Sequence, residues 1–349
     1  MENSLTQWTR KVRLGRLSMQ IGKLPRVRLA TLPTPLEEAP RLTKMLDGPK
    51  ILFKRDDNNG FALGGNKARK LEFLLADAIK DGADTIITTG GLQSNHARLT
   101  AAAAKKYGMR PILVLRGDET AESNGNLLLD QLLDAEIRTV PSDLRNTMPV
   151  MEDIAEEVRD SGGAPYIVPS GGSNPIGAIA YANAMLEIVS QAVEMNTKVD
   201  HIAFSSGSGG TQGGLLFGAK ALNFEGKVLG ISDGASRDPL IHKIVDIANG
   251  CARLIDSHAS VSLKEVDFLD QYAGKGYGIL QKEVFDAMVA VARVEGIFLD
   301  PVYTGKAMWG LIDLIRQGYF EKDETVVFIH TGGIPALFAY RKELAGFWG

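Results

Sequence analysis

A lysine, Lys67, stands directly after two glycines and at the start of an amphipathic pattern. Apolar residues then recur with the helical period at Ala68, Leu71, Leu75 and Ala78, which predicts a helix that begins at Lys67. Cations are disfavoured at the positive end of a helix, so Lys67, Arg69 and Lys70 in one first turn are a poor choice for stability alone. A solvated basic turn is the structural alternative. The functional interpretation is an amine presented where the glycine backbone leaves room for a ligand.

A run of polar side chains follows a predicted strand at residues 85–88. The loop continues through paired glycines into Gln93, Ser94, Asn95 and His96. Ligands of open parallel sheets bind at the carboxyl ends of the strands, where this loop lies. A helix N-cap needs only one such residue. We therefore interpret the run as a functional loop, with a plain N-cap at Ser94 or Asn95 as the alternative.

A glycine-rich stretch, Ser205–Gly213, separates another predicted strand from a helix. Free backbone N–H groups at a helix start, with glycines for close approach and hydroxyls as donors, form an anion site suited to a phosphate. The stretch is not a Walker loop, and Gln212 stands where the dinucleotide fingerprint needs its third glycine. Asp233 ends the next strand, where a ribose-binding acid would sit, so a nicotinamide enzyme stays open as an alternative. A structural glycine turn also stays open.

A hydroxyl at a third strand end, Thr331, precedes Gly332 and Gly333. Two tyrosines, Tyr277 and Tyr303, lie in glycine-containing loops, and each alone would be ordinary packing. Taken together, a lysine at a glycine turn, a phosphate loop and a strand-end hydroxyl are what pyridoxal phosphate needs. Lysine forms the Schiff base, a helix N-terminus holds the phosphate, and a group at the ring nitrogen tunes the electron sink.

Strands and helices alternate along the chain and must position these loops. Strands are expected at residues 85–88, 111–115, 137–140 and 166–168, then at 202–204, 228–231, near 266 and at 326–329. Residues 51–54 are interpreted as an edge strand. The pattern predicts an α/β fold with two open, mostly parallel, doubly wound sheets and the cofactor in the cleft between them. Residues 1–60 and 176–349 are assigned to a large cofactor-binding domain, and 61–175 to a small α/β domain.

The composition narrows the class of protein. The 349 residues are 44% hydrophobic and 23% charged, with a net charge of −3, which is typical of a globular chain with room for two domains. No basic stripe indicates a nucleic-acid partner. Residues 1–16 are polar and basic, so neither a signal peptide nor a membrane partner is expected. One cysteine, Cys251, excludes an internal disulfide; with five scattered histidines, no metal site is expected, and the expected location is cytoplasmic.

The chain resembles the family of D-cysteine desulfhydrase, 1-aminocyclopropane-1-carboxylate deaminase and L-cysteate sulfo-lyase, within the fold type II pyridoxal phosphate enzymes. The likeness runs from about Pro25 to Tyr340. It rests on seven ordered motifs: Pro33–Leu36, Lys54–Asp57, Gly64–Lys67, Gln93–His96, Gly207–Thr211, Asp300–Tyr303 and His330–Gly333. Relatives of this fold are commonly homodimers, so a homodimer is expected here.

The resemblance implies a role for each residue of these motifs. It implies Lys67 as the Schiff-base lysine, Asn66 on the ring hydroxyl and Thr331 on the pyridine nitrogen. The phosphate loop would consist of Ser206, Gly207, Ser208, Gly209, Gly210 and Thr211. The substrate carboxylate would be held by Gln93, Ser94 and Asn95, with Ser94 also serving in proton transfer. Tyr277 and Tyr303 resemble the two active-site tyrosines, which contact the substrate and take part in catalysis.

The resemblance implies a small β-substituted amino acid as the substrate, and one position helps to choose among the candidates. Cyclopropane-opening members of the family carry glutamate after the tyrosine of the Asp-Pro-Val-Tyr motif, whereas Thr304 stands here. A hydroxyl makes a weaker electron sink, which favours β-elimination of sulfide from D-cysteine to give pyruvate and ammonia. L-Cysteate, with release of sulfite, is the alternative, and Arg98, His96 or Arg237 would bind its sulfonate. The deaminase is less favoured, and outside the family a nicotinamide-dependent oxidoreductase or a non-enzymatic binding protein stays open.

Overall fold

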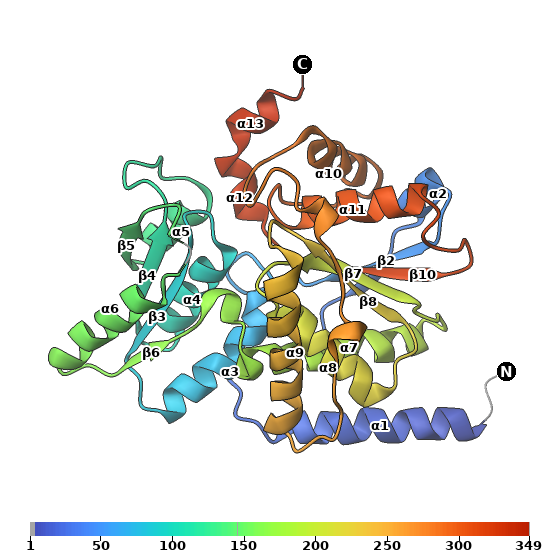
Figure 1. Ribbon diagram of the computed structural model, residues 1–349, viewed down its shortest axis with the longest axis horizontal. Coiled ribbons are helices and arrows are strands. Elements are labelled where there is room, and N and C mark those ends of the chain that lie inside the picture. Colours follow the sequence, from blue (N-terminus) through green and yellow to red (C-terminus); the bar gives the residue numbers. More distant parts are fainter. Residues whose placement is uncertain (1–3, 145, 349) are drawn as a thin grey trace.

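The computed structural model describes residues 4–144 and 146–348, with side chains from Val12 onward. Two separate sheets form the protein (Figure 1), one of six strands and one of four. Every strand pair is parallel except one at the edge of the larger sheet. The predicted fold class, two open and mostly parallel sheets with helices, is therefore confirmed.

The larger sheet has the order β1-β2-β10-β7-β8-β9. Its strands are β1 (Leu36–Glu38), β2 (Lys50–Arg55), β10 (Thr325–His330), β7 (His201–Ser206), β8 (Lys227–Ser232) and β9 (Asp267–Leu269). The predicted edge position of residues 51–54 is wrong. Strand β2 is covered by antiparallel β1 on one side and by β10 on the other, and its interior is fully buried, as an interior strand should be.

Helices cover both faces of this sheet. They are α1 (Ser4–Gly22), α2 (Pro40–Leu46), α7 (Pro175–Glu194), α8 (Gly210–Leu222), α9 (Arg237–Leu254), α10 (Lys282–Glu295), α11 (Thr304–Arg316), α12 (Ile334–Ala339) and α13 (Arg341–Ala345). One apolar cluster lies under α7, α8 and α9, and another under α2, α10 and α11. Among the described helices, α7 alone is long and apolar enough to cross a membrane, but it packs against α3, α8 and α9 as a core helix.

The smaller sheet has the order β5-β4-β3-β6 and is parallel throughout. Its elements are β3 (Thr85–Gly91), α4 (Asn95–Lys106), β4 (Arg110–Arg116), α5 (Gly125–Leu132), β5 (Glu136–Val140), α6 (Met148–Asp160) and β6 (Pro165–Ile167). Helix α3 (Lys67–Lys80) packs on both α4 and α7 and so joins the two halves. Three short 3₁₀ turns complete the described chain: Ser170–Gly172, Leu263–Glu265 and Asp270–Tyr272.

Arg69, in the first turn of α3, is buried in a network of charges. Its guanidinium donates to both carboxylate oxygens of Glu187 at 2.8 Å and to Asp56 at 2.9 Å. The Tyr181 hydroxyl donates to the other oxygen of Asp56 at 2.6 Å, and Lys54 pairs with Glu187 at 3.0 Å. A bidentate guanidinium–carboxylate pair has one preferred geometry, so this network fixes the start of α3. The alternative of a solvated basic turn is wrong for this residue.

The buried carboxyl of Asp130, on α5, predicts a pH-dependent stability. Burial raises its pKa to about 8, although Arg98 opposes the shift, and neither carboxyl oxygen has a partner among the described residues. Between pH 4 and pH 8 the folded state holds a proton that the unfolded state releases, so stability falls as the pH rises through this window. Asp130→Asn should therefore stabilise the protein by about 3 kcal/mol at pH 8.5 and by much less at pH 4.5. Urea unfolding at both pH values measures this.

The matched control for this prediction is Asp153→Asn, because Asp153 is an exposed carboxylate on α6. The control variant should change stability equally little at both pH values. A gain in the Asp130 variant that is the same at pH 4.5 and 8.5 would contradict the assignment of a buried, protonated carboxyl.

Candidate active site

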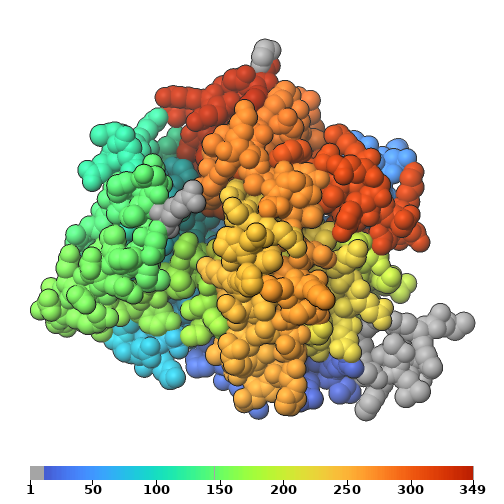
Figure 2. All heavy atoms as spheres, viewed as in Figure 1, coloured from blue at the N-terminus to red at the C-terminus, as the bar shows by residue number. Residues whose placement is uncertain are grey.

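A cavity of about 360 Å³ lies between the two sheets, at the carboxyl ends of their strands. From the smaller sheet it is lined by Gly90, Gly91 and Arg116, and from the larger sheet by the loops after β7, β8 and β10. In the space-filling view a recessed seam separates the green segments of the smaller sheet from the gold and orange segments after β8 (Figure 2). The volume falls in the range of ligand pockets, and the position is the one expected for open parallel sheets.

Lys67 lines this cavity from the first position of α3, and its Nζ donates to Asn66 Oδ1 at 2.9 Å. The chain approaches it through Gly64 (φ +72°), where a Cβ would come within 1.6 Å of the Asp57 carbonyl oxygen. Burial lowers the pKa of Lys67 to about 8, against the opposing charges of Asp233 and Asp300. A lysine with this pKa is partly neutral near pH 7 and can act as a nucleophile or a base.

The glycine-rich loop after β7 faces Lys67 across the cavity. Ser206, Gly207, Ser208, Gly209 and Thr211 line the cavity, whereas Gly210 turns its N–H to Ser173 Oγ at 3.3 Å. Asn66 Nδ2 donates to Thr211 Oγ1 at 3.3 Å, which ties the loop to α3. Gly209 is in the left-handed region (φ +86°) and gives α8 no side-chain cap. The start of α8 is therefore suited to an anion.

A second lysine, Lys70, lies near the start of α8 and would also favour an anion there. The sequence motifs assigned this residue no role. It is completely buried, and its Nζ donates to the Gly171 carbonyl at 3.1 Å. A Cβ on Gly210 would lie 2.9 Å from this Nζ, so the ammonium sits directly behind the glycine loop. Burial lowers its pKa well below the ordinary value, and Lys67 and Lys243 lower it further. The described residues place no carboxylate beside it, and a buried cation without a counter-charge indicates a bound anion.

The residues after β3 divide between structure and cavity. Ser94, Asn95 and His96 line the cavity, and Ser94 is also the N-cap of α4, accepting from Ala97 N at 3.2 Å. Gln93 was expected to hold the substrate carboxylate. Its side-chain oxygen instead accepts from Asn126 N at 2.8 Å and its nitrogen donates to Asn124 O at 3.0 Å. Gln93 does not line the cavity, because its amide is engaged by the start of α5.

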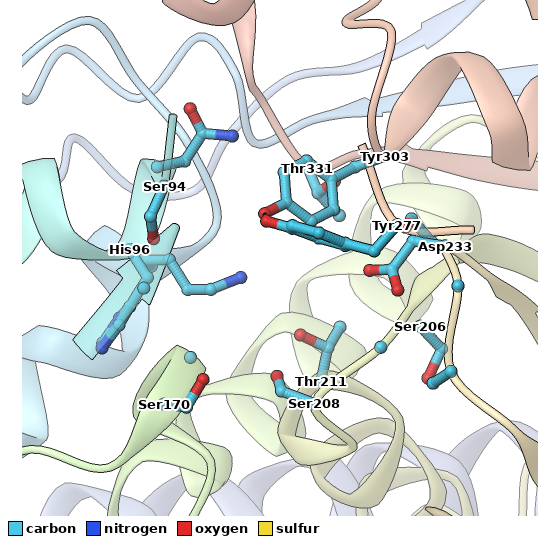
Figure 3. A pocket seen from close by; sticks show the side chains of 18 of the residues that line it. Ser94, His96, Ser170, Ser206, Ser208, Thr211, Asp233, Tyr277, Tyr303 and Thr331 are labelled. Atoms are coloured by element: carbon cyan, nitrogen blue, oxygen red, sulfur yellow. Dashed lines mark hydrogen bonds between the residues drawn. The ribbon is translucent and has the colours of Figure 1, made fainter. Parts of the chain in front are cut away.

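Tyr277, Tyr303 and Thr331 line the opposite wall, and Figure 3 shows them facing Ser94 and His96 across the cavity. The two tyrosine hydroxyls are hydrogen-bonded. Burial raises the pKa of Tyr277 to about 12 and that of Tyr303 well above its usual value; the hydrogen bond lowers the first and raises the second. Both phenols are therefore protonated near neutral pH, and either hydroxyl can be the donor of the hydrogen bond between them.

Thr304 and its neighbour Asp300 hold the start of α11. The Asp300 carboxylate accepts from the N–H groups of Val302, Tyr303 and Thr304 at 2.8–2.9 Å, and from the Thr304 hydroxyl at 2.7 Å. Thr304 is fully buried and does not line the cavity. The acid that does line the cavity is Asp233, directly after β8; burial raises its pKa to about 6, although Lys306 and Lys67 oppose the shift.

The three residues suggested for a sulfonate occupy different places. Arg98 is buried and donates to Gly64 O at 3.2 Å, and Arg237 donates to Phe268 O. Only His96 lines the cavity, and burial lowers its pKa well below the usual value, so it is neutral. Arg116, the last residue of β4, was not predicted as a site residue from the sequence. It lines the cavity, and the described residues give its guanidinium no hydrogen-bond or ion-pair partner.

The residues of the cavity fit pyridoxal phosphate. The uncapped start of α8 and Lys70, which has no carboxylate beside it among the described residues, suit its phosphate; Lys67 suits its aldehyde, and the Asn66 amide and Thr331 hydroxyl suit polar groups of its ring. Two buried atoms beside them, Ser205 Oγ and His96 Nδ1, have no partner in the described part of the chain. When bound, the cofactor supplies an aldehyde for amines and a ring that takes up the electron pair left by a departing Cα proton.

The sequence also matches a family model described as pyridoxal-phosphate dependent enzyme over residues 27–332. The chain belongs to the pyridoxal-phosphate-dependent enzymes. It is 41% identical over 334 residues to the D-cysteine desulfhydrase of Klebsiella pneumoniae, covering 94% of this chain and 100% of that one. It is 40% identical over 325 residues to a Pyrococcus abyssi protein provisionally named 1-aminocyclopropane-1-carboxylate deaminase, covering 93% of this chain and 96% of the relative.

Solved structures show the same fold. A crystal structure of a homologue of 1-aminocyclopropane-1-carboxylate deaminase has a TM-score of 0.88 at 40% identity, covering 95% of this chain and 98% of that chain. A pyridoxal 5'-phosphate-dependent aspartate racemase has a TM-score of 0.65 at 18% identity, covering 92% and 94% respectively, which supports the fold alone. This pyridoxal-phosphate-dependent lyase is thus neither the nicotinamide enzyme nor the non-enzymatic binding protein that the sequence left open.

Proposed function

We propose that this enzyme removes the β-substituent of a small amino acid, with D-cysteine as the substrate and pyruvate, sulfide and ammonia as products. The observation that carries this proposal is the meeting of an amine, Lys67, with the hydroxyls of Ser94 and Tyr277 around one phosphate-binding cavity. Proton removal and leaving-group departure need a base and an acid near the same substrate carbon. The 41% identity to a D-cysteine desulfhydrase supports the choice of substrate.

Each residue has a task in this proposal. With the cofactor and substrate bound, Lys67 Nζ would accept the Cα proton, and its pKa of about 8 suits that role. Ser94 and Asn95 bind the substrate carboxylate at the start of α4, because both line the cavity and a helix N-terminus favours an anion. Tyr277 donates its proton to the departing sulfur. Both phenols are protonated at neutral pH, as this donation requires.

L-Cysteate is the second candidate substrate because of Arg116. Arg116 lines the cavity and has no hydrogen-bond or ion-pair partner among the described residues, and such a guanidinium suits a sulfonate or a second carboxylate. Opening of a cyclopropane is less favoured, since Thr304 replaces the glutamate of such enzymes and is itself engaged by Asp300. We also propose a cytoplasmic homodimer, on the single cysteine and the family resemblance.

A substrate panel separates these candidates. Pyruvate from D-cysteine, L-cysteine and L-cysteate is measured together with sulfide and sulfite, and 2-oxobutanoate is measured for the cyclopropane amino acid. We expect sulfide and pyruvate from D-cysteine as the fastest reaction. Turnover of the cyclopropane alone would contradict the proposal.

Arg116→Gln refines this test. If a second anionic group on the substrate binds Arg116, the variant should lose about 10- to 100-fold in kcat/KM for L-cysteate and little for D-cysteine. Arg159→Gln is the control, because Arg159 is an exposed arginine on α6. Equal losses for both amino acids would contradict a selective contact between Arg116 and an anionic substituent.

A further inference from the structure

Lys306, in the first turn of α11, is completely buried and lies outside the motifs assigned above. Its Nζ donates to three backbone carbonyls: Asp233 at 3.0 Å, Ala273 at 2.9 Å and Gly276 at 2.5 Å. Burial lowers the pKa of this lysine, although Asp233 and Asp300 oppose the shift. A buried cation at the positive end of a helix is doubly unfavourable, so its place needs a reason other than the stability of α11.

The three carbonyls belong to two segments that meet at Tyr277. One is the end of β8, and the other is the loop that contains the tyrosine. Asp233 directly precedes Gly234, and Gly276 directly precedes Tyr277. A Cβ on Gly234 would lie 2.7 Å from the Tyr277 nitrogen and 2.9 Å from its Cα, so the two backbones are already in contact. The lysine ammonium therefore joins the end of β8 to the backbone just before the tyrosine.

The segment from residue 273 to 280 has no helix or strand of its own. Gly274, Gly276 and Gly278 all have positive φ, at +65°, +133° and +73°. Such a loop has many backbone conformations available when nothing outside it restrains it. After the tyrosine, the Tyr340 hydroxyl holds the Gly278 carbonyl at 2.7 Å. Lys306 supplies the matching restraint before the tyrosine.

The restraint closes on itself through α11. Tyr303 stands three residues before Lys306 at the start of this helix, and its hydroxyl is hydrogen-bonded to that of Tyr277. Tyr277 as a whole residue is 47% exposed, whereas its hydroxyl end is enclosed and hydrogen-bonded to Tyr303. The start of α11 therefore contacts Tyr277 at two points: Lys306 binds the backbone just before it, and Tyr303 binds its hydroxyl.

We propose that Lys306 is a positioning residue that fixes the Tyr277 hydroxyl in the cavity by clamping the 273–277 backbone to the end of β8. This inference rests on the β-elimination proposed above, in which Tyr277 donates a proton to the leaving group. Lys306 itself does not line the cavity, so it acts through Tyr277. A proton donor displaced by about 1 Å loses rate steeply.

The test compares Lys306→Met with the wild-type holoenzyme, alone and combined with Tyr277→Phe. In the single variant we expect amide hydrogen exchange of residues 274–279 to rise about tenfold or more. We expect kcat to fall roughly 100-fold with little change in KM. In the Tyr277→Phe background the same substitution should cost less than about threefold, because no hydroxyl is left to position.

Two further variants keep the test decisive if Lys306→Met folds poorly. Lys306→Arg retains donors and charge and should recover most of the activity. Gly234→Ala pushes on the Tyr277 backbone from the other side, leaves the lysine in place and should show the same dependence on the Tyr277 hydroxyl. Leu311→Ala is the control, since Leu311 is buried in the same helix within the apolar cluster. It should lower stability without raising exchange in residues 274–279.

The exchange measurement does not depend on the substrate, so it separates the clamp from the proposed function. Faster exchange with no turnover of any amino acid would support the clamp and contradict the β-elimination. Unchanged exchange in Lys306→Met, or an equal rate loss with tyrosine and with phenylalanine at position 277, would overturn the positioning role.

Discussion

Lys67→Ala is expected to abolish turnover, with a loss of about 10⁴-fold or more, because in the proposed function one residue supplies both the covalent link to the cofactor and the base for the Cα proton. Lys67 is the lysine that lines the cavity at the start of α3, with its pKa lowered to about 8. The lysine-bound cofactor should give an absorbance band near the visible edge that borohydride bleaches. The variant should lack that band even when the cofactor is added in excess.

Lys80→Ala is the matched control for this prediction. Lys80 lies in the last turn of the same helix and is exposed, so it tests the loss of a lysine from α3 without reaching the cavity. It should keep the band and the activity. A Lys67→Ala variant that still turns over at a tenth of the wild-type rate, or that keeps a borohydride-sensitive band, would show that another amine carries the cofactor.

The placement of Lys67 followed from local patterns, whereas the fates of its neighbours did not. Two glycines, a helical period and strand ends are sequence-local, and they correctly predicted the start of α3 and the α/β class. Three cations in that first turn looked alike in sequence. The fold sends Lys67 to the cavity, Arg69 to Glu187 and Lys70 behind the glycine loop. Glu187 lies 118 residues from Arg69 and Gly171 lies 101 residues from Lys70 along the chain, and no local pattern reports such contacts.

Gln93 and Arg116 show the same limit in opposite directions. Gln93 looked functional because it begins a polar run, yet its amide is engaged by the start of α5. Arg116 directly follows the expected strand at 111–115 and received no role from the sequence, yet it lines the cavity. Helix α1 was missed because residues 1–16 are mostly polar, and its anchors Leu17 and Ile21 contribute only a short apolar edge to the core.

Pairing within the larger sheet was also beyond the sequence. Residues 51–54 do form a strand, as expected, but this strand is not at the edge of the sheet. The edge is formed by β1, an antiparallel strand that follows the proline-containing segment at residues 25–35. A strand of three residues carries little pattern of its own. Its formation depends on the hydrogen-bonding edge that β2 offers after the sheet assembles.

The second large effect is expected from Lys70→Met. The substitution should stabilise the protein without cofactor and should weaken the binding of the cofactor. Without cofactor, the wild type keeps a buried ammonium whose pKa is lowered well below normal, with no carboxylate beside it in the described chain. At neutral pH the unfolded state binds this proton more readily, so the buried lysine destabilises the folded apo-protein. The variant should therefore stabilise the apo-protein by about 1–3 kcal/mol.

With cofactor, the same substitution removes the charge that lies behind the glycine loop and that we expect to stabilise the phosphate. Affinity for pyridoxal phosphate should fall about 100-fold, because a charge-assisted contact contributes roughly 1.5–3 kcal/mol. Affinity for pyridoxal, which lacks the phosphate, should not change. Lys54→Met is the matched control: Lys54 is equally buried but is paired with Glu187 at 3.0 Å, so its loss should destabilise the apo-protein instead. Thermal unfolding of the wild type and of each variant is measured without ligand, with pyridoxal phosphate and with pyridoxal. Two results would contradict this role: an equal loss of affinity for pyridoxal and for pyridoxal phosphate, or a less stable apo-protein in Lys70→Met. Lys70 would then be a structural lysine, and the start of α8 alone would have to bind the phosphate.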